Sequence, residues 1–538
     1  KTSRLYDPAG GYTSEGWPIG DFNLLAITLD NCNGALRDAN YKCINSTGFL
    51  IPDISGTYSL SFKGQADVGG VQNKVYNSAT GYTTAQVIVP TTQQELSLYF
   101  RNTNGQPITN IKLLRPGYSL GTSKVFTDEF IYSIQPFTTL RLMDYLRTNW
   151  CNEDTRPEYK NNCDSDERRA YFGTSIEWSE RTLPSRATLN GPTAGSIELM
   201  VQLANEQQKD LWINIPHYAS EDYIYGLANY LKNGETINGV FYPPLNNNSK
   251  VYLEYSNEVW NTFAAFEQSG TVRQMTQDYI NANPSNAAFI NNPDSGIYYA
   301  TRRYTVLRIF RASDIFREVF GDSEMIKRIR PVFADQVSWP GQAGDALNWA
   351  WRSYPHPPSY YIYGLAGAPY IGSPNDVSSS GTPSQIVADE LYDVNTRLNT
   401  ALLDFSKVSY TNHYSIAQTY GIKTLAYEGG THLTDNVNVA NKIGSAYYTG
   451  SSPNEEEAIR IYLASWYACG GDLFMYFNHA SAYGGEQWGL TEDVRGDYNR
   501  QSSPPKLKAA KSVAQSPINT FECGPSANGI YGQSFTGV

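Results

Sequence analysis

The sequence has little charge and no long apolar run. Asp, Glu, Lys and Arg make up 17% of its 538 residues, and 52 acidic against 41 basic side chains give a net charge of −11. A nucleic-acid-binding surface needs a basic patch, and no cluster of Arg and Lys interleaved with aromatic residues occurs, so we expect no nucleic-acid partner. No stretch of about eighteen consecutive apolar residues is present either, so we expect no membrane span.

Motifs of metal and nucleotide enzymes are also missing. None of the six cysteines belongs to a CxxC pair, and no HExxH sequence occurs, so no zinc site is indicated. No Gly-rich phosphate loop follows an early strand of the mixed α/β region described below. The sequence therefore implies neither a metal nor a cofactor.

Cysteine is scarce, yet its number is even. Two pairs enclose short polar loops, which is the spacing of local disulfides, and the remaining pair would link the C-terminal tail to a late strand. This pairing is one of about fifteen possible connectivities. The expected pairs are Cys32 with Cys43, Cys151 with Cys163, and Cys469 with Cys523.

Two further features predict a secreted glycoprotein. The glycosylation sequons at Asn45 and Asn247 lie in polar loops. The sequence begins at Lys1 rather than Met, as expected of a mature chain whose signal peptide has been removed. Disulfides persist in oxidising compartments, so the even number of cysteines agrees with an extracellular location.

Tyrosine is abundant, with 41 Tyr against 21 Phe, and there are 10 Trp. Aromatic rings with polar edges suit the faces of sugars, although they also suit protein interfaces and fibre surfaces. Residues 1–108 contain short alternating runs at 58–64, 85–90 and 95–100, separated by clusters of Gly, Asn, Pro or Thr. This pattern predicts an N-terminal β-sandwich, which serves packing or contact with carbohydrate.

From about residue 109, strand-like runs alternate with helical stretches. Such alternation requires parallel strands joined by crossover helices. Eight predicted strands within 109–515 indicate a (β/α)8 barrel, and an open doubly wound sheet is the alternative. Residues 516–538 are predicted to be a surface tail tied by a disulfide. The predicted strands are 110–116, 139–145, 210–217, 251–258, 328–335, 363–370, 424–430 and 472–479, and the predicted helices are 195–208, 220–232, 297–319, 385–405, 453–465 and 504–514.

Polar residues gather where these strands end. In a barrel of this kind the carboxyl ends of the strands form the active site. The polar residues at these ends are Arg141, Asp144, His217, Asn257, Glu258, Asp335, Tyr370, Glu428 and His479.

Two of these residues are glutamates on opposing sides of the expected barrel mouth. Glu258 ends the fourth predicted strand and Glu428 the seventh. Glycoside hydrolysis needs two carboxyl groups across a sugar-sized cleft. One protonates the leaving oxygen, and the other attacks the anomeric carbon from a separation of about 5–5.5 Å when configuration is retained.

With this arrangement the chain resembles the retaining glycoside hydrolases of clan A, whose (β/α)8 barrels carry an Asn-Glu pair at strand four and a Glu at strand seven. The resemblance covers 109–515 and implies that Glu258 is the acid/base and that Glu428, in AYEGG, is the nucleophile. Within the clan, the chain is similar to poorly characterised secreted proteins with a β-sandwich ahead of a WINIPH…EYSNEVWN…YEGG barrel. Some of those proteins are labelled cellulose-binding.

The resemblance also implies a set of residues that contact the substrate or the nucleophile. Asn257 would offer its amide to the sugar 2-hydroxyl. Arg141 or Tyr370 would lower the pKa of Glu428 and so keep it ionised. The implied set is Arg141, His217, Asn257, Tyr370 and, in the QWGL stretch, the sugar-stacking Trp488.

The predicted function is a secreted retaining β-glycoside hydrolase that cleaves a polysaccharide, with a β-glucan or cellulose favoured. The alternative is a non-catalytic extracellular glycoprotein that keeps the barrel and binds carbohydrate or builds a filament or wall. One departure from the clan leaves room for this alternative, since His413 lies before strand seven rather than beside Tyr370. No motif specifies self-assembly.

Overall fold

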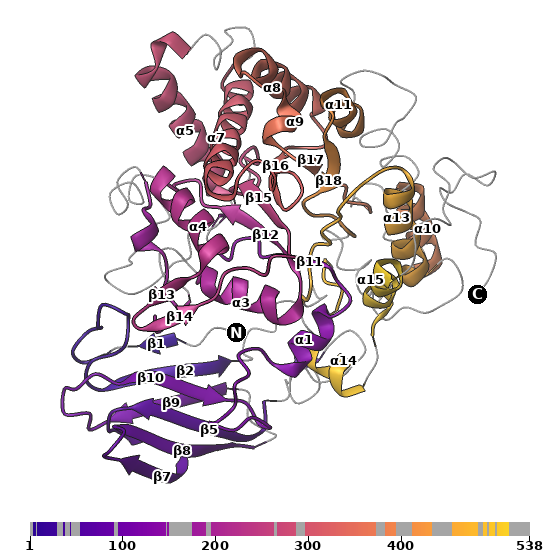
Figure 1. Cartoon of the computed structure of the whole chain (residues 1–538). Coiled ribbons are helices and arrows are strands. Elements are labelled where there is room, and N and C mark those ends of the chain that lie inside the picture. Colours follow the sequence, from indigo (N-terminus) through magenta and orange to yellow (C-terminus); the bar gives the residue numbers. More distant parts are fainter. Residues whose placement is uncertain are drawn as a thin grey trace.

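The computed structural model contains a part with antiparallel sheets and a part with a parallel sheet surrounded by helices (Figure 1). The indole Nε1 of Trp17, from the first part, donates to the carbonyl oxygen of Ser185 in the second at 3.2 Å. The structure describes residues 4–6, 8–28, 36–37, 43–44, 54–90, 95–146, 148–149, 175–189, 195–262, 266–286, 296–372, 382–393, 412–432, 454–481, 488–491, 494–500 and 503–515.

Two four-stranded antiparallel sheets are built from the alternating runs of the N-terminal region. Their shared core is centred on Phe100, whose ring stacks on Phe22 at 4.4 Å between centroids and meets Phe62 of the other sheet edge-on at 5.2 Å. In order of pairing, the strands are β1 (Arg4–Tyr6), β2 (Phe22–Thr28), β9 (Glu95–Arg101) and β6 (Asp67–Val68) in one sheet, and β10 (Thr109–Leu114), β5 (Gly56–Lys63), β8 (Tyr82–Val89) and β7 (Val71–Asn77) in the other. The short strands β3 (Leu36–Arg37) and β4 (Cys43–Ile44) pair with each other.

The prediction that 110–116 forms a strand of the barrel is wrong. This segment is β10, which pairs antiparallel with β5. Its side chains explain the difference, because Asn110 and Lys112 are exposed and alternate with less exposed residues. A strand with one solvated face belongs to an antiparallel sheet, whereas parallel strands between helices are buried on both faces.

A six-stranded parallel sheet forms the centre of the second part. Each described pair of neighbours is parallel, for example Leu211 with Val251 and Gly364 with Lys423. In order of pairing, its strands are β11 (Thr139–Arg141), β12 (Asp210–Ile215), β15 (Val251–Tyr255), β16 (Ile329–Ala334), β17 (Gly364–Gly367) and β18 (Lys423–Ala426).

The predicted strand at 472–479 is reduced to a single parallel bridge between Phe474 and Ala426 of β18. Six of the eight predicted strands therefore belong to this sheet, and one more position adjoins it. Within the described residues the strands form an open curl and not a closed eight-stranded barrel.

Helices cover the outer face of the parallel sheet. They include the six predicted stretches, of which 385–405 is described only to residue 393, and others that were not predicted, such as Glu267–Ala282 and Pro340–Ser353. No helix in the described ranges is both long enough and apolar enough to cross a membrane. A β-hairpin, β13 (Glu235–Ile237) with β14 (Val240–Tyr242), follows α4. The helices are α1 (Asp128–Ile134), η2 (Trp178–Glu180), α3 (Ile197–Gln207), α4 (Glu221–Asn233), α5 (Glu267–Ala282), α7 (Gly296–Phe320), α8 (Pro340–Ser353), α9 (Pro358–Tyr361), α10 (Pro383–Asp393), α11 (His413–Tyr420), α13 (Glu455–Ala468), α14 (Val494–Arg500) and α15 (Pro505–Gln515).

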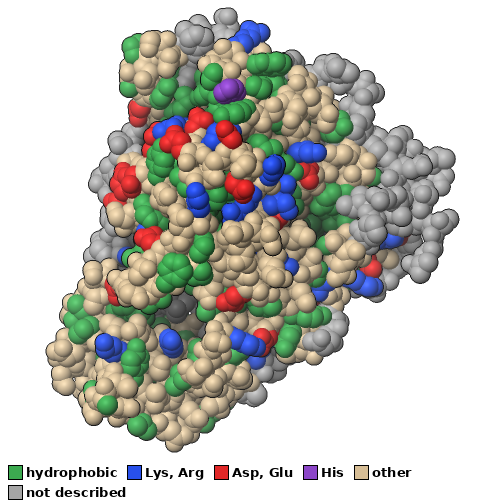
Figure 2. Space-filling view, viewed as in Figure 1, with side chains coloured by type: hydrophobic (Ala, Val, Ile, Leu, Met, Phe, Trp, Pro, Cys, Tyr) green, Lys and Arg blue, Asp and Glu red, His purple; other side chains and the backbone are tan. Residues whose placement is uncertain are grey.

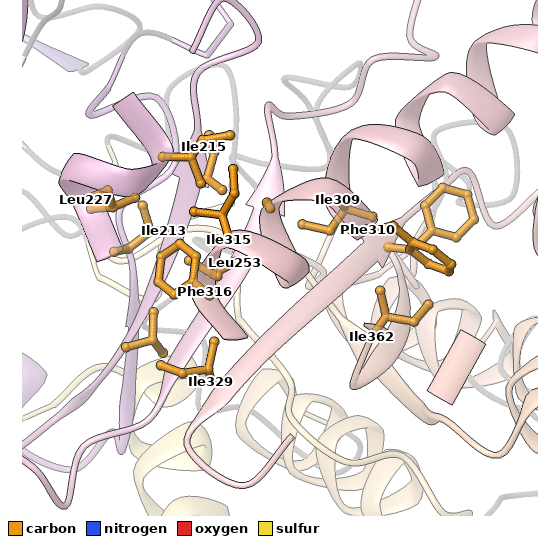
Figure 3. Close-up of a cluster of buried hydrophobic side chains, with 14 of the residues drawn as sticks. Ile213, Ile215, Leu227, Leu253, Ile309, Phe310, Ile315, Phe316, Ile329 and Ile362 are labelled. Carbon is orange, nitrogen blue, oxygen red and sulfur yellow. The ribbon is translucent and has the colours of Figure 1, made fainter. Parts of the chain in front are cut away.

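Both faces of the parallel sheet are buried, and they differ in chemistry. Toward the helices, Ile213, Ile215 and Leu253 pack with side chains of α4 and α7 such as Leu227 and Phe316 (Figure 3). Because successive residues of a strand point to opposite faces, the residues between these apolar ones point inward. They are aromatic or charged and include Trp212, Tyr252 and Glu254.

Charged side chains gather over the helical part of the surface, where acidic and basic groups are interspersed, and the antiparallel sheets present mainly uncharged surface (Figure 2). One of the ion pairs between helices joins Arg311 of α7 to Glu221 of α4 at 2.7 Å. Such exposed pairs contribute about 0–1 kcal/mol each, so apolar packing and not surface charge holds the helices to the sheet.

Candidate active site

Two acidic side chains meet at the carboxyl edge of the parallel sheet. Glu258 follows β15 by three residues, and Glu428 follows β18 by two. Both are 8% exposed. The charge of Glu258 raises the pKa of Glu428, so the two carboxyl groups lie close to one another.

The turn after β15 holds Glu258 in a backbone conformation that favours glycine. Ser256 has φ 58° and Glu258 has φ 42°. Such conformations cost about 1–3 kcal/mol per residue and persist where the surroundings enforce them. Here the side-chain amide of Asn214 donates to the carbonyl oxygen of Ser256 at 2.7 Å, and the backbone N–H of Ser256 donates to that of Ile215 at 2.8 Å.

The turn after β18 depends on the two glycines that follow Glu428. A Cβ atom at Gly429 would lie 2.7 Å from the ring of Phe474 and 2.9 Å from the hydroxyl of Tyr462. Gly430 has φ 144°, which side chains rarely allow. The chain can therefore bend sharply at this point and leave the Glu428 side chain at the edge of the sheet.

Glu258 receives two neutral hydrogen-bond donors. The hydroxyl of Tyr427 donates to Oε1 at 2.8 Å, and the amide of Asn261 donates to Oε2 at 2.7 Å. Tyr427 directly precedes Glu428. Of these two consecutive residues after β18, the first contacts the carboxyl group of Glu258 and the second supplies the other carboxyl group of the pair. The ring of Trp260 lies 5.8 Å from that of Tyr427 between centroids and forms an apolar wall.

Glu428 has one neutral and one charged partner. The hydroxyl of Tyr370 donates to Oε1 at 3.0 Å, and Nη1 of Arg141 lies 3.6 Å from Oε2. Burial and the adjoining Glu258 nevertheless raise the pKa of Glu428 well above its usual value, against the effects of Arg141 and Tyr370. Arg141 and Tyr370 each lower this pKa, as expected, but burial and the charge of Glu258 outweigh them.

A third carboxylate, Glu254, explains why Arg141 has so little effect. The guanidinium of Arg141 makes a bidentate contact with Glu254, with Nε to Oε2 at 3.1 Å and Nη2 to Oε1 at 3.1 Å. Trp212 also donates to Glu254, at 2.7 Å. The guanidinium of Arg141 is thus shared between Glu254 and Glu428, and it contacts Glu254 more closely.

The side chain of Asn257 is held from both ends. Its Oδ1 accepts from Nη2 of Arg141 at 2.6 Å, and its Nδ2 donates to Oδ1 of Asn149 at 2.7 Å. Gln268 of α5 donates to the same Asn149 oxygen and to the carbonyl oxygen of Asn257. An amide nitrogen carries two hydrogens, so one N–H of Asn257 is left for a further acceptor.

Tyr370, which contacts Glu428, belongs to a group of four aromatic rings from the segments after β17, β18 and Phe474. Tyr370 lies 5.4 Å from the ring of His432, and Trp488 stacks near His432 at 6.2 Å and 29°. Phe477 contacts Trp488 at 5.2 Å and Tyr370 at 6.5 Å. The structure therefore brings Trp488 and Tyr370, two of the residues expected from the sequence, into one aromatic group.

Two more of the expected strand-end residues, His217 and Asp335, are buried, and their partners differ. His217 exchanges a hydrogen bond with Ser256, in the turn that carries Glu258, at 3.2 Å between Nδ1 and Oγ. Asp335 is fully buried and pairs with Arg302 at 3.1 Å.

One histidine, His413, is fully buried, and a second, His479, is half-buried. Burial lowers the pKa of His413 and of His479 to about 4 in each case. His479 bonds with the hydroxyl of Ser133 on α1 at 2.8 Å. No group of three or more His, Cys, Asp or Glu in the described part of the chain is placed to hold a metal ion.

Several expected modification sites can be located only in part. Cys469, directly after α13, is disulfide-bonded, and Cys43 lies in β4. Asn247 is exposed in a turn before β15, as a glycosylated residue must be. Outside the described residues lie Asn45, Cys32, Cys151, Cys163 and Cys523.

Comparison with known proteins adds little to this picture. No model of a protein family matches the chain, and no curated protein matches it. Among solved structures it is similar to the N-terminal endo-1,4-β-D-xylanase 10B of Clostridium thermocellum, comprising CBM22-1 and GH10 modules complexed with xylohexaose, with 8% identity and a TM-score of 0.32 over 96% of this chain and 94% of that one. A TM-score this low establishes neither a shared fold nor a shared activity.

Proposed function

We propose that the chain is a retaining glycoside hydrolase that cleaves a β-linked polysaccharide. The observation that carries the proposal is the meeting of Glu258 and Glu428 at the carboxyl edge of the parallel sheet, on strands far apart in the sequence. Burying two adjoining carboxyl groups is costly, and groups so placed are characteristic of functional sites.

In the proposed mechanism Glu258 is the acid and Glu428 the nucleophile. Glu258 gives its proton to the glycosidic oxygen while Glu428 attacks the anomeric carbon, and a glycosyl–enzyme ester forms as the C–O bond breaks. Glu258, now ionised, takes a proton from water, whose oxygen displaces Glu428. Each oxygen of Glu428 then regains its partner, Tyr370 or Arg141.

The proposed mechanism requires a proton on Glu258 and an ionised Glu428 when the reaction begins. Arg141, which contacts Glu428, favours the ionised form of that residue. A sugar ring that enters between the carboxyl groups moves them toward the separation of about 5–5.5 Å used in retaining enzymes and weakens their repulsion. Glu428 can then ionise against Arg141.

The proposal extends to the fold and to the setting of the protein. We infer that the parallel sheet closes into a (β/α)8 barrel in which the segment at Phe474 occupies the position after β18. We further infer that the antiparallel sheets form a separate unit and that the chain is secreted, disulfide-bonded and glycosylated. The disulfide at Cys469 and the exposed Asn247 support this setting.

A non-catalytic carbohydrate-binding or wall protein is the second candidate. The raised pKa of Glu428 favours it, because the nucleophile of a retaining enzyme must be ionised when it attacks. A β-glucan or cellulose is the substrate favoured under the first candidate and the ligand favoured under the second.

The test is hydrolysis of a panel of β-glucan, mannan, xylan and galactan, with the anomer of the product followed by NMR. We expect release of reducing ends with retained configuration, and loss of at least a thousandfold in Glu258→Gln and in Glu428→Gln. Glu206→Gln, on an exposed position of α3, is the matched control and should keep full activity. A wild-type protein that binds one polymer but hydrolyses none would establish the second candidate.

A further inference from the structure

We propose that Trp339 is a stacking platform for one sugar unit of an extended, uncharged glycan chain, on the rim of the site that holds Glu258 and Glu428. The inference rests on the proposed function, which identifies the glycan as the substrate that is cleaved. It adds that the protein binds this glycan at a sugar unit beyond the scissile bond and therefore prefers polymers to short substrates.

The position of Trp339 in the fold places it on this rim. It lies in the connection between the carboxyl end of β16 at Ala334 and the first residue of α8, Pro340. In the sheet β16 stands between β15, which leads to Glu258, and β17, which leads to Tyr370. The carboxyl ends of parallel strands meet at one edge, so the connection borders the carboxyl pair.

The indole of Trp339 is 61% exposed, although Trp is among the side chains that gain most from burial. A single exposed apolar residue is common and needs no function. The backbone beneath this residue is nevertheless unusually well fixed for an exposed connection.

Three observations show how the backbone is fixed. The N–H of Trp339 donates to the carbonyl oxygen of Gln336 at 3.2 Å, and the carbonyl oxygen of Trp339 accepts from Gln342 in the first turn of α8 at 3.0 Å. Pro340 restricts the next φ angle. Val337 packs so closely on Gly367 of β17 that a Cβ there would lie 2.5 Å from its Cγ2. These contacts fix the backbone that carries the indole. A Trp side chain has only two rotatable χ angles, so its ordering on binding costs little entropy.

The charges near Trp339 favour a neutral ligand. Asp335, at the start of the same connection, is paired with Arg302 in the interior. The flat apolar face of an indole suits the C–H face of a pyranose ring, while its N–H can bond a hydroxyl group. An uncharged β-linked glycan offers such faces at regular intervals.

Trp351 provides a matched control on the same helix. It is 52% exposed, near the C-terminal end of α8, with its ring 5.5 Å from that of Tyr420. At about 1.5 Å per residue, the helix separates the two tryptophans by about 18 Å. α8 returns from the carboxyl edge, so Trp351 lies toward the opposite end of the sheet.

The experiment compares wild type, Trp339→Ala and Trp351→Ala by two measurements. The first is kcat/KM on the soluble polymer that wild type cleaves and on its oligosaccharides of two to six units. The second is retardation in native gels that contain each soluble β-glycan. We expect Trp339→Ala to lose roughly 3- to 10-fold in kcat/KM on polymer and on the longest oligosaccharide, with the shortest cleaved substrate unchanged, and to lose retardation. Trp351→Ala should behave as wild type.

The outcomes separate this inference from the proposed function. Wild type that cleaves polymer, with Trp339→Ala equal to it on every chain length and in the gels, would overturn the platform and leave the hydrolase intact. Wild type that is retarded but inactive, with retardation lost only in Trp339→Ala, would support the platform and overturn the hydrolase. Wild type that is neither retarded nor active on any polymer would overturn both.

Discussion

Replacing Tyr427 with Phe removes one oxygen atom from the site and leaves the aromatic ring in place. The hydroxyl donates to Oε1 of Glu258 at 2.8 Å within a buried environment. A hydrogen bond to a charged group contributes about 1.5–3 kcal/mol net, and about 1.4 kcal/mol corresponds to a tenfold change in rate. If the bond orients Glu258 during proton transfer, Tyr427→Phe should lower kcat/KM on a glycan roughly tenfold to a hundredfold.

A comparison of two leaving groups distinguishes a loss of the orientation of Glu258 from a general loss of activity. An alkoxide leaving group needs the proton of Glu258, whereas a dinitrophenolate departs without it. We therefore expect Tyr427→Phe to lose activity on the glycan and to form the glycosyl–enzyme from a dinitrophenyl glycoside at the wild-type rate, measured as the pre-steady-state burst. Tyr58→Phe is the control, since that buried hydroxyl donates to the carbonyl oxygen of Ile54 at 2.8 Å in the antiparallel sheets.

Two results would refute this reasoning. An unchanged kcat/KM on the glycan would mean that the hydroxyl does not orient Glu258. An equal loss on both substrates would mean that Tyr427 supports the neighbouring Glu428 or the fold. The melting temperature of the variant, compared with that of Tyr58→Phe, decides between these last two causes.

Three further predictions concern buried groups. Glu254→Gln removes the carboxylate that holds the buried Arg141 in a bidentate contact and should lower the free energy of unfolding by about 3 kcal/mol in urea titrations; an unchanged midpoint would contradict the assigned pairing. The pKa of His413 is about 4 in the folded state against 6.5 in the unfolded state, so its stability contribution is complete above pH 6.5 and falls toward pH 4 by about 3 kcal/mol. In His413→Gln, the urea midpoint should therefore fall less steeply between pH 7.5 and 4.5 than in wild type. A pH dependence of the midpoint equal to that of wild type would contradict this role of His413. Phe62→Ala should cost about 3–5 kcal/mol by the same titration, and a loss below about 1 kcal/mol would show that the two antiparallel sheets do not share a core.

The parallel strands could be predicted because they are buried on both faces. The run from Val251 to Tyr255 is buried at every position, and such near-continuous runs between helices have few other interpretations. The segment 110–116 also contains apolar residues, but Asn110 and Lys112 mark a solvated face. The expected boundary near residue 109, and not the segment's own pattern, placed this strand in the wrong part.

The position of the site was predictable, but its charge state was not. Glu258 and Glu428 follow from the rule that strand ends converge, which needs no knowledge of side-chain contacts. Glu254 carried a usable signal, because residues at even spacing on a strand share a face, and Glu254 lies four before Glu258. The hydroxyl contact of Tyr427 had no such signal, since it joins residues on different strands whose spacing depends on the curvature of the sheet.

The three glutamates and one arginine at this edge have an uneven balance of charge. One guanidinium faces three carboxyl groups, and burial and Glu258 raise the pKa of Glu428. A neutral glycan brings no positive charge to this edge. In the proposed mechanism, the oxocarbenium-like transition state would place positive charge on the sugar beside Glu428 and offset the excess of carboxyl groups. Groups fixed in this way would bind the transition state more strongly than the substrate, which is the condition for catalysis. A wall or binding protein would gain nothing from maintaining the same imbalance.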